Sequence, residues 1–299
     1  MYTAKPPDRD GVSASVIATT AGSWPTFLDF LAQRFRAVDR NEWLARTNSG
    51  AVVDQHGVKI NSDTSYRLNN KLFYYRFVAD EPHIPFKETV LFQDDLIVVA
   101  DKPHFLPVTP TGRYVQETLL VRLKRKLGIE TLAPMHRIDR DTAGLVLFTI
   151  QPHTRDAYQK LFRERCIEKT YQAIAPWRAD LSLPVIYRSQ LLESDAFMQM
   201  QAVDGDANAL TAIEVMEISG HLARYRLRPL TGQKHQIRAH MAALDIPIVN
   251  DRIYPLLQPD TGAKQDWNSP LKLLAKAISF VDPVTGRARS FENHRTLEF

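Results

Sequence analysis

The chain contains little of what marks a secreted protein, a membrane-spanning protein or a cysteine-ligated metal protein. Cys166 is the one cysteine among 299 residues, which excludes a disulfide framework and a cysteine-based metal site and is typical of the reducing cytosol. No apolar run approaches the roughly 18 residues needed to span a membrane. Residues 1–22 lack the charged start and apolar core of a secretory signal. We therefore expect a cytoplasmic protein with no membrane partner.

Basic residues are concentrated in the middle of the chain, although the net charge is only +4. Residues 121–170 contain eleven Lys and Arg against six Asp and Glu. Most of them fall into two groups, Arg122, Lys124, Arg125 and Lys126, then Arg155, Lys160, Arg163, Arg165 and Lys169. A positive surface attracts a polyanion and makes its binding salt-dependent. Nucleic acid is therefore a candidate partner, although a solvated helix surface would explain the same residues.

The chain is long enough for one large domain and a small one, and its apolar fraction of 44% supports a packed core. Residues 1–22 are mostly small and polar, and we expect them to be flexible. Residues 23–78 are expected to form a compact module. Residues 79–90 contain two prolines and are typical of a linker. Residues 91–299 then form the large domain.

The module of residues 23–78 begins with two predicted helices. Apolar residues at helical spacing predict the first helix over 26–35, and a second runs from Arg40 to Arg46 with Gly50 at its end. Short strands are expected at 51–53, 58–60 and 72–76.

This arrangement resembles the small αL-type RNA-binding module of a small-subunit ribosomal protein and of many RNA-modifying enzymes. The resemblance implies that Arg40, Arg46 and Lys59 contact phosphates. The module's usual Val-Asn-Gly turn reads Val53-Asp54-Gln55-His56-Gly57 here, and Asp54 would weaken phosphate attraction. A small structural domain is the alternative.

The most informative segment is 135–145, which places Asp139 among arginines just before the apolar run 145–148. That run is typical of a buried strand. A carboxylate beside a buried strand is costly unless it is paired, which makes this a candidate for chemistry. A polar turn with aspartates capping backbone N–H groups is the alternative.

Further segments along the chain identify a family. With the first segment, the chain resembles the RNA pseudouridine synthases of the large-subunit (Rlu, RluA-like) type over roughly residues 91–292. The resemblance rests on Asp94-Asp95 with Asp101-Lys102-Pro103, on His136-Arg137-Ile138-Asp139 with Thr142 and Gly144, on Lys169 with Tyr171, and on His235-Gln236-Ile237-Arg238 with His240, Pro247-Ile248, Asp251 and Tyr254. It implies an α+β fold, with a long, mixed, mostly antiparallel sheet, helices around it, and a cleft with Asp139 at its floor.

The resemblance also implies the reaction, in which a uridine in structured RNA, tRNA or rRNA, becomes pseudouridine. The base must leave its sugar, turn over and bond again through C5. No redox step or group donor is involved, so no cofactor or metal is expected, and no obligatory protein partner is implied. The chemistry needs one ionised carboxylate, which the resemblance assigns to Asp139. Whether it attacks C1′, attacks the base or removes a sugar proton stays open.

The other site residues are assigned by the same resemblance. Arg238 faces the carboxylate and favours its charged form. Tyr171 packs on the uracil and handles the C5 proton; the alternative is an ordinary buried strand tyrosine. Arg137 fills the place of the flipped base; the alternative is an ion pair with Asp141. Ile237 lines the pocket as an apolar wall.

The lysines and histidines of these motifs have supporting roles. Lys102, Lys169 and Lys234 are expected to contact phosphate or backbone. His136, His235 and His240 lack metal-ligand partners at helical spacing and are expected to form a hydrogen-bonding scaffold. His136 is the one of the three that we also assign to RNA binding.

Two other functions compete with this interpretation. One is an inactive RNA-binding protein of the same fold, against which the intact set of Asp139, Tyr171 and Arg238 argues. The other is a glycoside hydrolase that uses Asp139 and Asp141 as a carboxylate pair. The family pattern also has departures, namely Gln233 in place of an arginine, Ala143 in place of a serine, Leu274 in place of a histidine and Asn250 in place of a glycine.

Overall fold

The computed structural model describes residues 6–78, 80–194, 198–258 and 265–299. It divides into two compact units. The first comprises residues 1–82, 110–116 and 121–130, and the second comprises residues 83–109, 117–120 and 131–299. The first break in the chain therefore falls inside the predicted linker, but two segments that we expected in the large domain belong to the first unit. No helix of the described residues is long and apolar enough to cross a membrane.

The first unit is built from two helices and a three-stranded antiparallel sheet in the order β1-β3-β2. Its elements are β1 (Ser15–Ala18), α1 (Phe27–Arg34), α2 (Arg40–Asn48), β2 (Val52–Asp54) and β3 (Lys71–Tyr74). Thr26 caps α1 by accepting a hydrogen bond from the N–H of Asp29, and Asp39 caps α2 in the same way through Asn41. The helices and the sheet enclose an apolar core that includes Phe30, Trp43 and Leu72.

Two details of this unit differ from the expectation. Residues 15–18, which we placed in a flexible segment, form β1 and pair with β3, because alternate side chains of this strand are half-buried on the sheet. Residues 58–60 form a single bridge, between Lys59 and Val53, and not a strand. Gly50 ends α2 as expected, with a φ of +68° that favours glycine.

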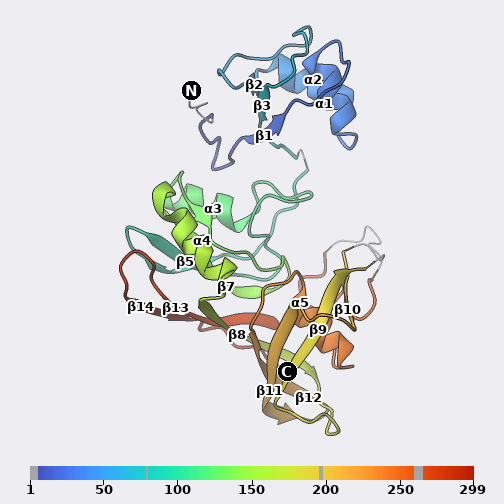
Figure 1. Ribbon diagram of the computed structural model, residues 1–299, viewed down its shortest axis with the longest axis vertical. Coiled ribbons are helices and arrows are strands. Elements are labelled where there is room, and N and C mark those ends of the chain that lie inside the picture. Colours follow the sequence, from blue (N-terminus) through green and yellow to red (C-terminus); the bar gives the residue numbers. More distant parts are fainter. Residues whose placement is uncertain (1–5, 79, 195–197, 259–264) are drawn as a thin grey trace. The chain divides into compact units, whose positions relative to one another are not determined.

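The second unit is built around an 11-stranded sheet (Figure 1). Its strands are β4 (Thr89–Gln93), β5 (Ile97–Lys102), β6 (Ala133–Pro134), β7 (Ala143–Thr149), β8 (Ile167–Pro176), β9 (Val185–Glu193), β10 (Met200–Val203), β11 (Ala209–Ser219), β12 (Leu222–Pro229), β13 (Leu273–Val281) and β14 (Ala288–Glu292). The order is β10-β9-β11-β12-β8-β13-β7-β5-β4, with β14 on β13 and β6 on β7. Among the described strands only β7 and β13 pair in parallel, which confirms the mixed, mostly antiparallel sheet.

Two helices cover this sheet, and each packs on one of its larger apolar clusters. α4 (Arg155–Arg163) places Tyr158 in a cluster with β5, β7 and β13, while α5 (Gln236–Ala243) places Ile237 and Met241 in a cluster with β8, β12 and β13. Figure 1 shows α4 near β7 and α5 beside β9 and β10. A third helix, α3 (Leu119–Leu127), carries the basic run of residues 122–126.

The parallel pair depends on a glycine. Gly144 has a φ of +114°, and a Cβ there would lie 2.3 Å from the carbonyl oxygen of Ala275. No other residue allows the two backbones to approach this closely. The close contact fixes the start of β7, and with it the end of the preceding loop that carries Asp139.

Candidate active site

The loop between β6 and β7, residues 135–142, carries Asp139 and is tied to the end of β5. The Nζ atom of Lys102 donates hydrogen bonds to the carbonyl oxygens of Pro103 at 3.0 Å, Leu106 at 2.8 Å and Arg140 at 2.9 Å. His104 Nδ1 lies 2.7 Å from the carbonyl oxygen of Asp141. The backbone on either side of Asp139 is therefore held by groups that follow β5.

This geometry shows which of the two contacts expected of Lys102, phosphate or backbone, its side chain makes. Its side chain is fully buried, and three backbone carbonyls occupy its three N–H donors. It cannot contact RNA. Burial lowers the pKa of Lys102 to about 7, against the opposing charges of Asp141 and Asp139. Its role is to position the loop.

Asp139 lies against the guanidinium of Arg238. Arg238 Nη1 donates to Asp139 Oδ2 at 3.0 Å. The carboxylate is 31% exposed and the arginine side chain only 2%, so the aspartate is accessible and its partner is not. Desolvation of Arg238 opposes its charge, but hydrogen bonds and the charges of Asp251 and Asp139 outweigh this and raise its pKa. The guanidinium stays charged and stabilises a negative Asp139.

A second carboxylate holds that arginine. Asp251 accepts from Arg238 Nε at 2.8 Å and from Nη2 at 2.7 Å. Its Oδ1 also accepts the N–H groups of Ile253 at 2.8 Å and Tyr254 at 3.0 Å. The buried aspartate thus has donors on both oxygens, and the remaining nitrogen of the guanidinium points to Asp139.

The first turn of α5 is anchored to β11, which fixes Arg238 in direction. Gln236 Nε2 donates to the carbonyl oxygen of Leu210 at 2.8 Å and to the hydroxyl of Thr211 at 2.9 Å. His240 is buried and lies 2.9 Å from the same hydroxyl, and burial lowers its pKa to about 4. His240 is placed as a neutral hydrogen-bonding scaffold.

His235 and Tyr254 close the site on the other side. His235 Nε2 is 3.7 Å from Asp139 Oδ1, and its Nδ1 is 3.3 Å from Tyr254 Oη. Burial lowers the pKa of His235, so its ring is neutral at pH 7. The Tyr254 hydroxyl accepts the N–H of Met200 at 2.7 Å.

Tyr171 lies on β8 and packs against the cluster that contains Ile237. Burial raises the pKa of its phenol, and the negative charge of Asp139 raises it further. The phenol is therefore protonated at pH 7, and it lies within range of electrostatic interaction with Asp139. Ile237 is 7% exposed and belongs mainly to the core.

The arginines of the loop have different surroundings. Asp141 pairs with Arg140, whose Nε is 2.9 Å from Oδ1, and not with Arg137 as the alternative expectation had it. Arg137 is exposed. His136, in contrast, is turned inward: its Nε2 accepts the N–H of Leu147 at 3.2 Å, and its ring stacks on Phe162 at 4.7 Å. Burial lowers its pKa to about 3. His136 therefore acts as a hydrogen-bonding scaffold, and its Nε2 atom is not available to RNA.

The other predicted RNA contacts have partners of their own. Lys169 is half-buried and donates to the carbonyl oxygen of Thr231 at 3.3 Å. Lys234 is exposed, 3.9 Å from Glu193. In the first unit, Arg40 pairs with Asp29 at 2.9 Å, Arg46 pairs with Glu42 and lies over the ring of Trp43, and the stem of Lys59 covers Gly50.

Sequence reasoning missed the part played by Asp251 and Tyr254. Both were in the motif that followed Arg238, but no role was assigned to them. A buried arginine needs a paired acid, and that requirement was the available signal. Among the described residues, no group of three or more His, Cys, Asp or Glu is placed to hold a metal ion.

Comparisons with known proteins agree with one another. The family model described as RNA pseudouridylate synthase matches residues 96–243. The dual-specificity RNA pseudouridine synthase RluA of Haemophilus influenzae is 30% identical, over 68% of this chain and 90% of that protein. The mitochondrial tRNA pseudouridine(32) synthase of Saccharomyces cerevisiae is 32% identical, over 76% of this chain and 50% of its own length.

An uncharacterised RNA pseudouridine synthase of Synechocystis is 28% identical, over 76% of this chain and 78% of that protein. Among solved structures, human RNA pseudouridylate synthase domain containing 1 superposes with a TM-score of 0.57 at 19% identity, covering 72% of this chain and 86% of that one. At this identity the structural likeness concerns the fold.

Proposed function

The chain belongs to the RNA pseudouridylate synthase family, and on this premise we propose that Asp139 is the carboxylate at which it converts uridine in RNA into pseudouridine. The observation that carries the proposal is the chain of contacts from Asp251 through Arg238 to Asp139. It presents a partly exposed carboxylate against a buried, permanently charged guanidinium. Such a group is ready to act as nucleophile or base at the sugar–base bond.

The reaction is an isomerisation in which the atoms balance within one nucleotide. The N1–C1′ bond breaks, the C5–C1′ bond forms, C5 loses its proton and N1 ends with one. In our proposal Tyr171 relays the C5 proton: its phenol is protonated, so it passes its own proton to Asp139 or solvent as its oxygen takes up the proton from C5. The neutral ring of His235 lies 3.7 Å from the other oxygen of the carboxylate.

Access to the base requires that the uridine leave its stack, which costs a few kcal/mol. We assign to Arg137 the role of filling the vacated place, since its side chain is exposed at the edge of the loop that carries Asp139 and a guanidinium stacks well on bases. In the first unit, Arg40, Arg46 and Lys59 are proposed to contact RNA phosphates.

The substrate is proposed to be tRNA or rRNA. The yeast relative is named for position 32 of tRNA, and the Haemophilus relative is named as dual-specific. We place the protein in the cytoplasm, because its single cysteine suits a reducing compartment.

The test is to incubate the protein separately with unmodified tRNA and rRNA transcripts and to map pseudouridine by a chemical primer-extension stop. Asp139→Asn is expected to abolish the product and to leave RNA affinity nearly unchanged. Retained turnover in that variant would refute the assignment.

Asp141→Asn is the matched control, because Asp141 lies in the same loop but binds Arg140 instead of Arg238. It is expected to yield pseudouridine. Release of free uracil by the native protein, and its loss in either variant, would instead favour the glycoside hydrolase with two carboxylates.

A further inference from the structure

A cationic pocket of about 200 Å³ lies in the second unit. One wall comes from the end of α4, the start of β8 and Arg165 between them, and the other comes from the loop between β12 and α5. The residues that line it are Phe162, Arg163, Arg165, Ile167, Lys169, Leu230, Thr231, Gly232 and Gln233. Resting on the proposed function, we infer that this pocket binds a backbone phosphate of the RNA next to the flipped uridine.

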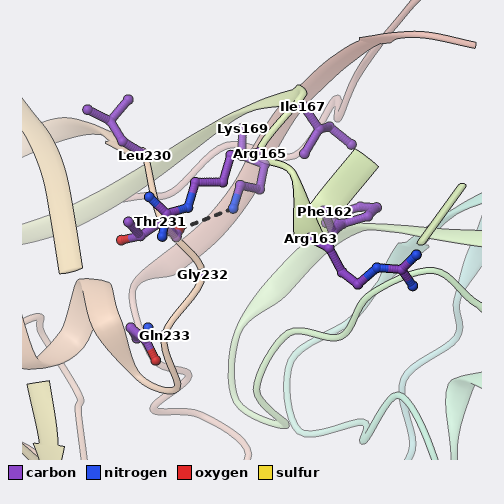
Figure 2. A pocket seen from close by; sticks show the side chains of 9 residues that line it. All are labelled: Phe162, Arg163, Arg165, Ile167, Lys169, Leu230, Thr231, Gly232 and Gln233. Carbon is purple, nitrogen blue, oxygen red and sulfur yellow. Dashed lines mark hydrogen bonds between the residues drawn. The ribbon is translucent and has the colours of Figure 1, made fainter. Parts of the chain in front are cut away.

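Two of the three basic side chains of the pocket act together. Figure 2 shows Arg165 and Lys169 extending toward Thr231, while Arg163 points away from them. Burial lowers the pKa of the Lys169 amine, and the positive charge of Arg165 lowers it further. The two cations therefore lie close enough to repel each other.

The carboxylates next to them in sequence do not neutralise this pair. Glu164 lies 3.5 Å from Lys160, and Glu168 accepts from the hydroxyl of Ser279 at 3.3 Å. Within the described part of the chain, no ion pair is found for Arg165 or Lys169. Two clustered cations without a carboxylate are stabilised when an anion binds between them. Arg163, in contrast, is paired with Asp156 at 2.8 Å.

The facing loop leaves room for that anion at Gly232. Its φ lies outside the left-handed region, and a Cβ there would meet nothing within 4 Å. Neither backbone conformation nor packing therefore requires glycine at this position. A glycine here leaves the backbone open to close approach by a ligand. The hydroxyl of the neighbouring Thr231 is engaged with Leu210 and Gln236, which holds the loop still.

The position of the pocket identifies the anion. Lys169 and Tyr171 are two residues apart on β8 and so share a face of the strand, about 7 Å apart. Gly232 precedes Arg238 in the segment that enters α5. Each wall of the pocket is therefore continuous along the chain with a proposed catalytic residue, and we expect an RNA whose uridine lies at Tyr171 to bring a neighbouring phosphate to it.

The test measures RNA affinity at several salt concentrations. Arg165→Asn combined with Lys169→Gln removes both charges; asparagine suits the left-handed φ of +59° at position 165, and glutamine can still donate to Thr231. Filter binding of unmodified tRNA and rRNA transcripts is expected to weaken about tenfold, with the slope of log K against log salt reduced in magnitude by about 1.

Arg178→Ala is the matched control, because this guanidinium is paired with Asp180 and Asp245 and does not line the pocket; its RNA affinity and salt slope are expected to equal those of the native protein. If the double variant has the thermal midpoint of the native protein and the same salt slope, the proposal that this pocket binds an RNA phosphate is refuted. Millimolar inorganic phosphate at constant ionic strength should weaken RNA binding by the native protein more than by the double variant. An equal effect on both would count against the pocket.

These outcomes are separable from failure of the proposed function. Pseudouridine formed by the native protein, with no change of slope in the double variant, would refute the pocket alone. A reduced slope, with no pseudouridine formed by the native protein on either RNA, would refute the function alone.

Discussion

Asp251 holds the guanidinium of Arg238 through two parallel hydrogen bonds, of 2.8 Å from Nε and 2.7 Å from Nη2. This paired geometry uses one edge of the planar fork and fixes its orientation. The nitrogen left over, Nη1, then has one direction available, and Asp139 lies along it at 3.0 Å. The direction of the proposed catalytic carboxylate is therefore set by a second, buried carboxylate behind the arginine.

Asp251→Asn should impair both activity and stability. The side chains of Arg238 and Asp251 are 2% and 1% exposed, and breaking one partner of a buried ion pair costs about 3–5 kcal/mol. Loss of orientation at Asp139 should lower kcat for pseudouridine formation by about 100-fold. Rates of product formation and urea unfolding measure the two effects.

Asp245→Asn serves as the control, since Asp245 is 85% exposed in its ion pair with Arg178. Its effect should stay within about 0.5 kcal/mol, with full activity. Native activity in Asp251→Asn would show that Arg238 does not need Asp251 to hold Asp139.

Gly144→Ala should disrupt the junction of β7 and β13. The added Cβ would lie 2.3 Å from the carbonyl oxygen of Ala275, on top of the strain at φ +114°. Because backbone cannot move aside as a flexible side chain can, we expect a loss of about 3 kcal/mol or more, measured by urea unfolding.

Gly220→Ala separates the two causes. Gly220 also has a positive φ, of +59°, but open space around its Cβ. Backbone strain alone should cost about 1 kcal/mol there. Equal losses for the two variants would mean that the contact with Ala275 adds nothing.

Buried histidines should make the protein less stable in mild acid. Burial lowers the pKa of His104, His136 and His240 to about 4, 3 and 4 respectively. Their contribution is fully present above the unfolded pKa of about 6.5. Below it the unfolded chain binds protons that the folded chain excludes, so this stability is lost as the pH falls from about 6.5 toward 3 to 4.

His136 gives this dependence a test, because its Nε2 must stay unprotonated to accept the N–H of Leu147. His136→Gln, whose amide oxygen can accept the same bond, should make the unfolding free energy fall less between about pH 7 and pH 5, by up to about 2 kcal/mol. The exposed His153→Gln should keep the native profile. A His136→Gln profile that matches the native one would exclude His136 as a source of the acid sensitivity.

The sequence predicted those features that depend on local pattern or on the family motif. The caps at Thr26 and Asp39 start helices within a residue of their expected positions, and the apolar run after Ala143 becomes the buried β7. The mixed sheet came from the resemblance. The helix starts and the buried strand depend on residues close together in the sequence, and the mixed sheet follows from the order of the family motifs.

What the sequence could not predict depends on distant partners. For Lys102 the sequence left phosphate and backbone contacts both open, since its acceptors are carbonyl oxygens whose positions the side-chain sequence does not encode. β1 was missed because it pairs with β3, more than fifty residues later. The pocket of Arg165 and Lys169 was not predicted, because its other wall is the loop at Gly232, more than sixty residues later in the chain.

Tyr171→Phe tests the proposed proton-handling role against the ordinary alternative of a buried strand tyrosine. Removing the hydroxyl keeps the ring packed near Ile237, so RNA affinity should persist. Loss of a general acid or base lowers a rate by about 10²–10⁴-fold, and pseudouridine formation should fall by that order.

Tyr225→Phe is the matched control: that phenol is also buried in the sheet and donates to the carbonyl oxygen of Pro176 at 2.7 Å. Loss of the Tyr225 hydroxyl should cost about 1 kcal/mol of stability and leave the rate of pseudouridine formation unchanged. Equal rates for the two variants would mean that Tyr171 has a purely structural role, and the C5 proton would then have to leave through Asp139 or solvent.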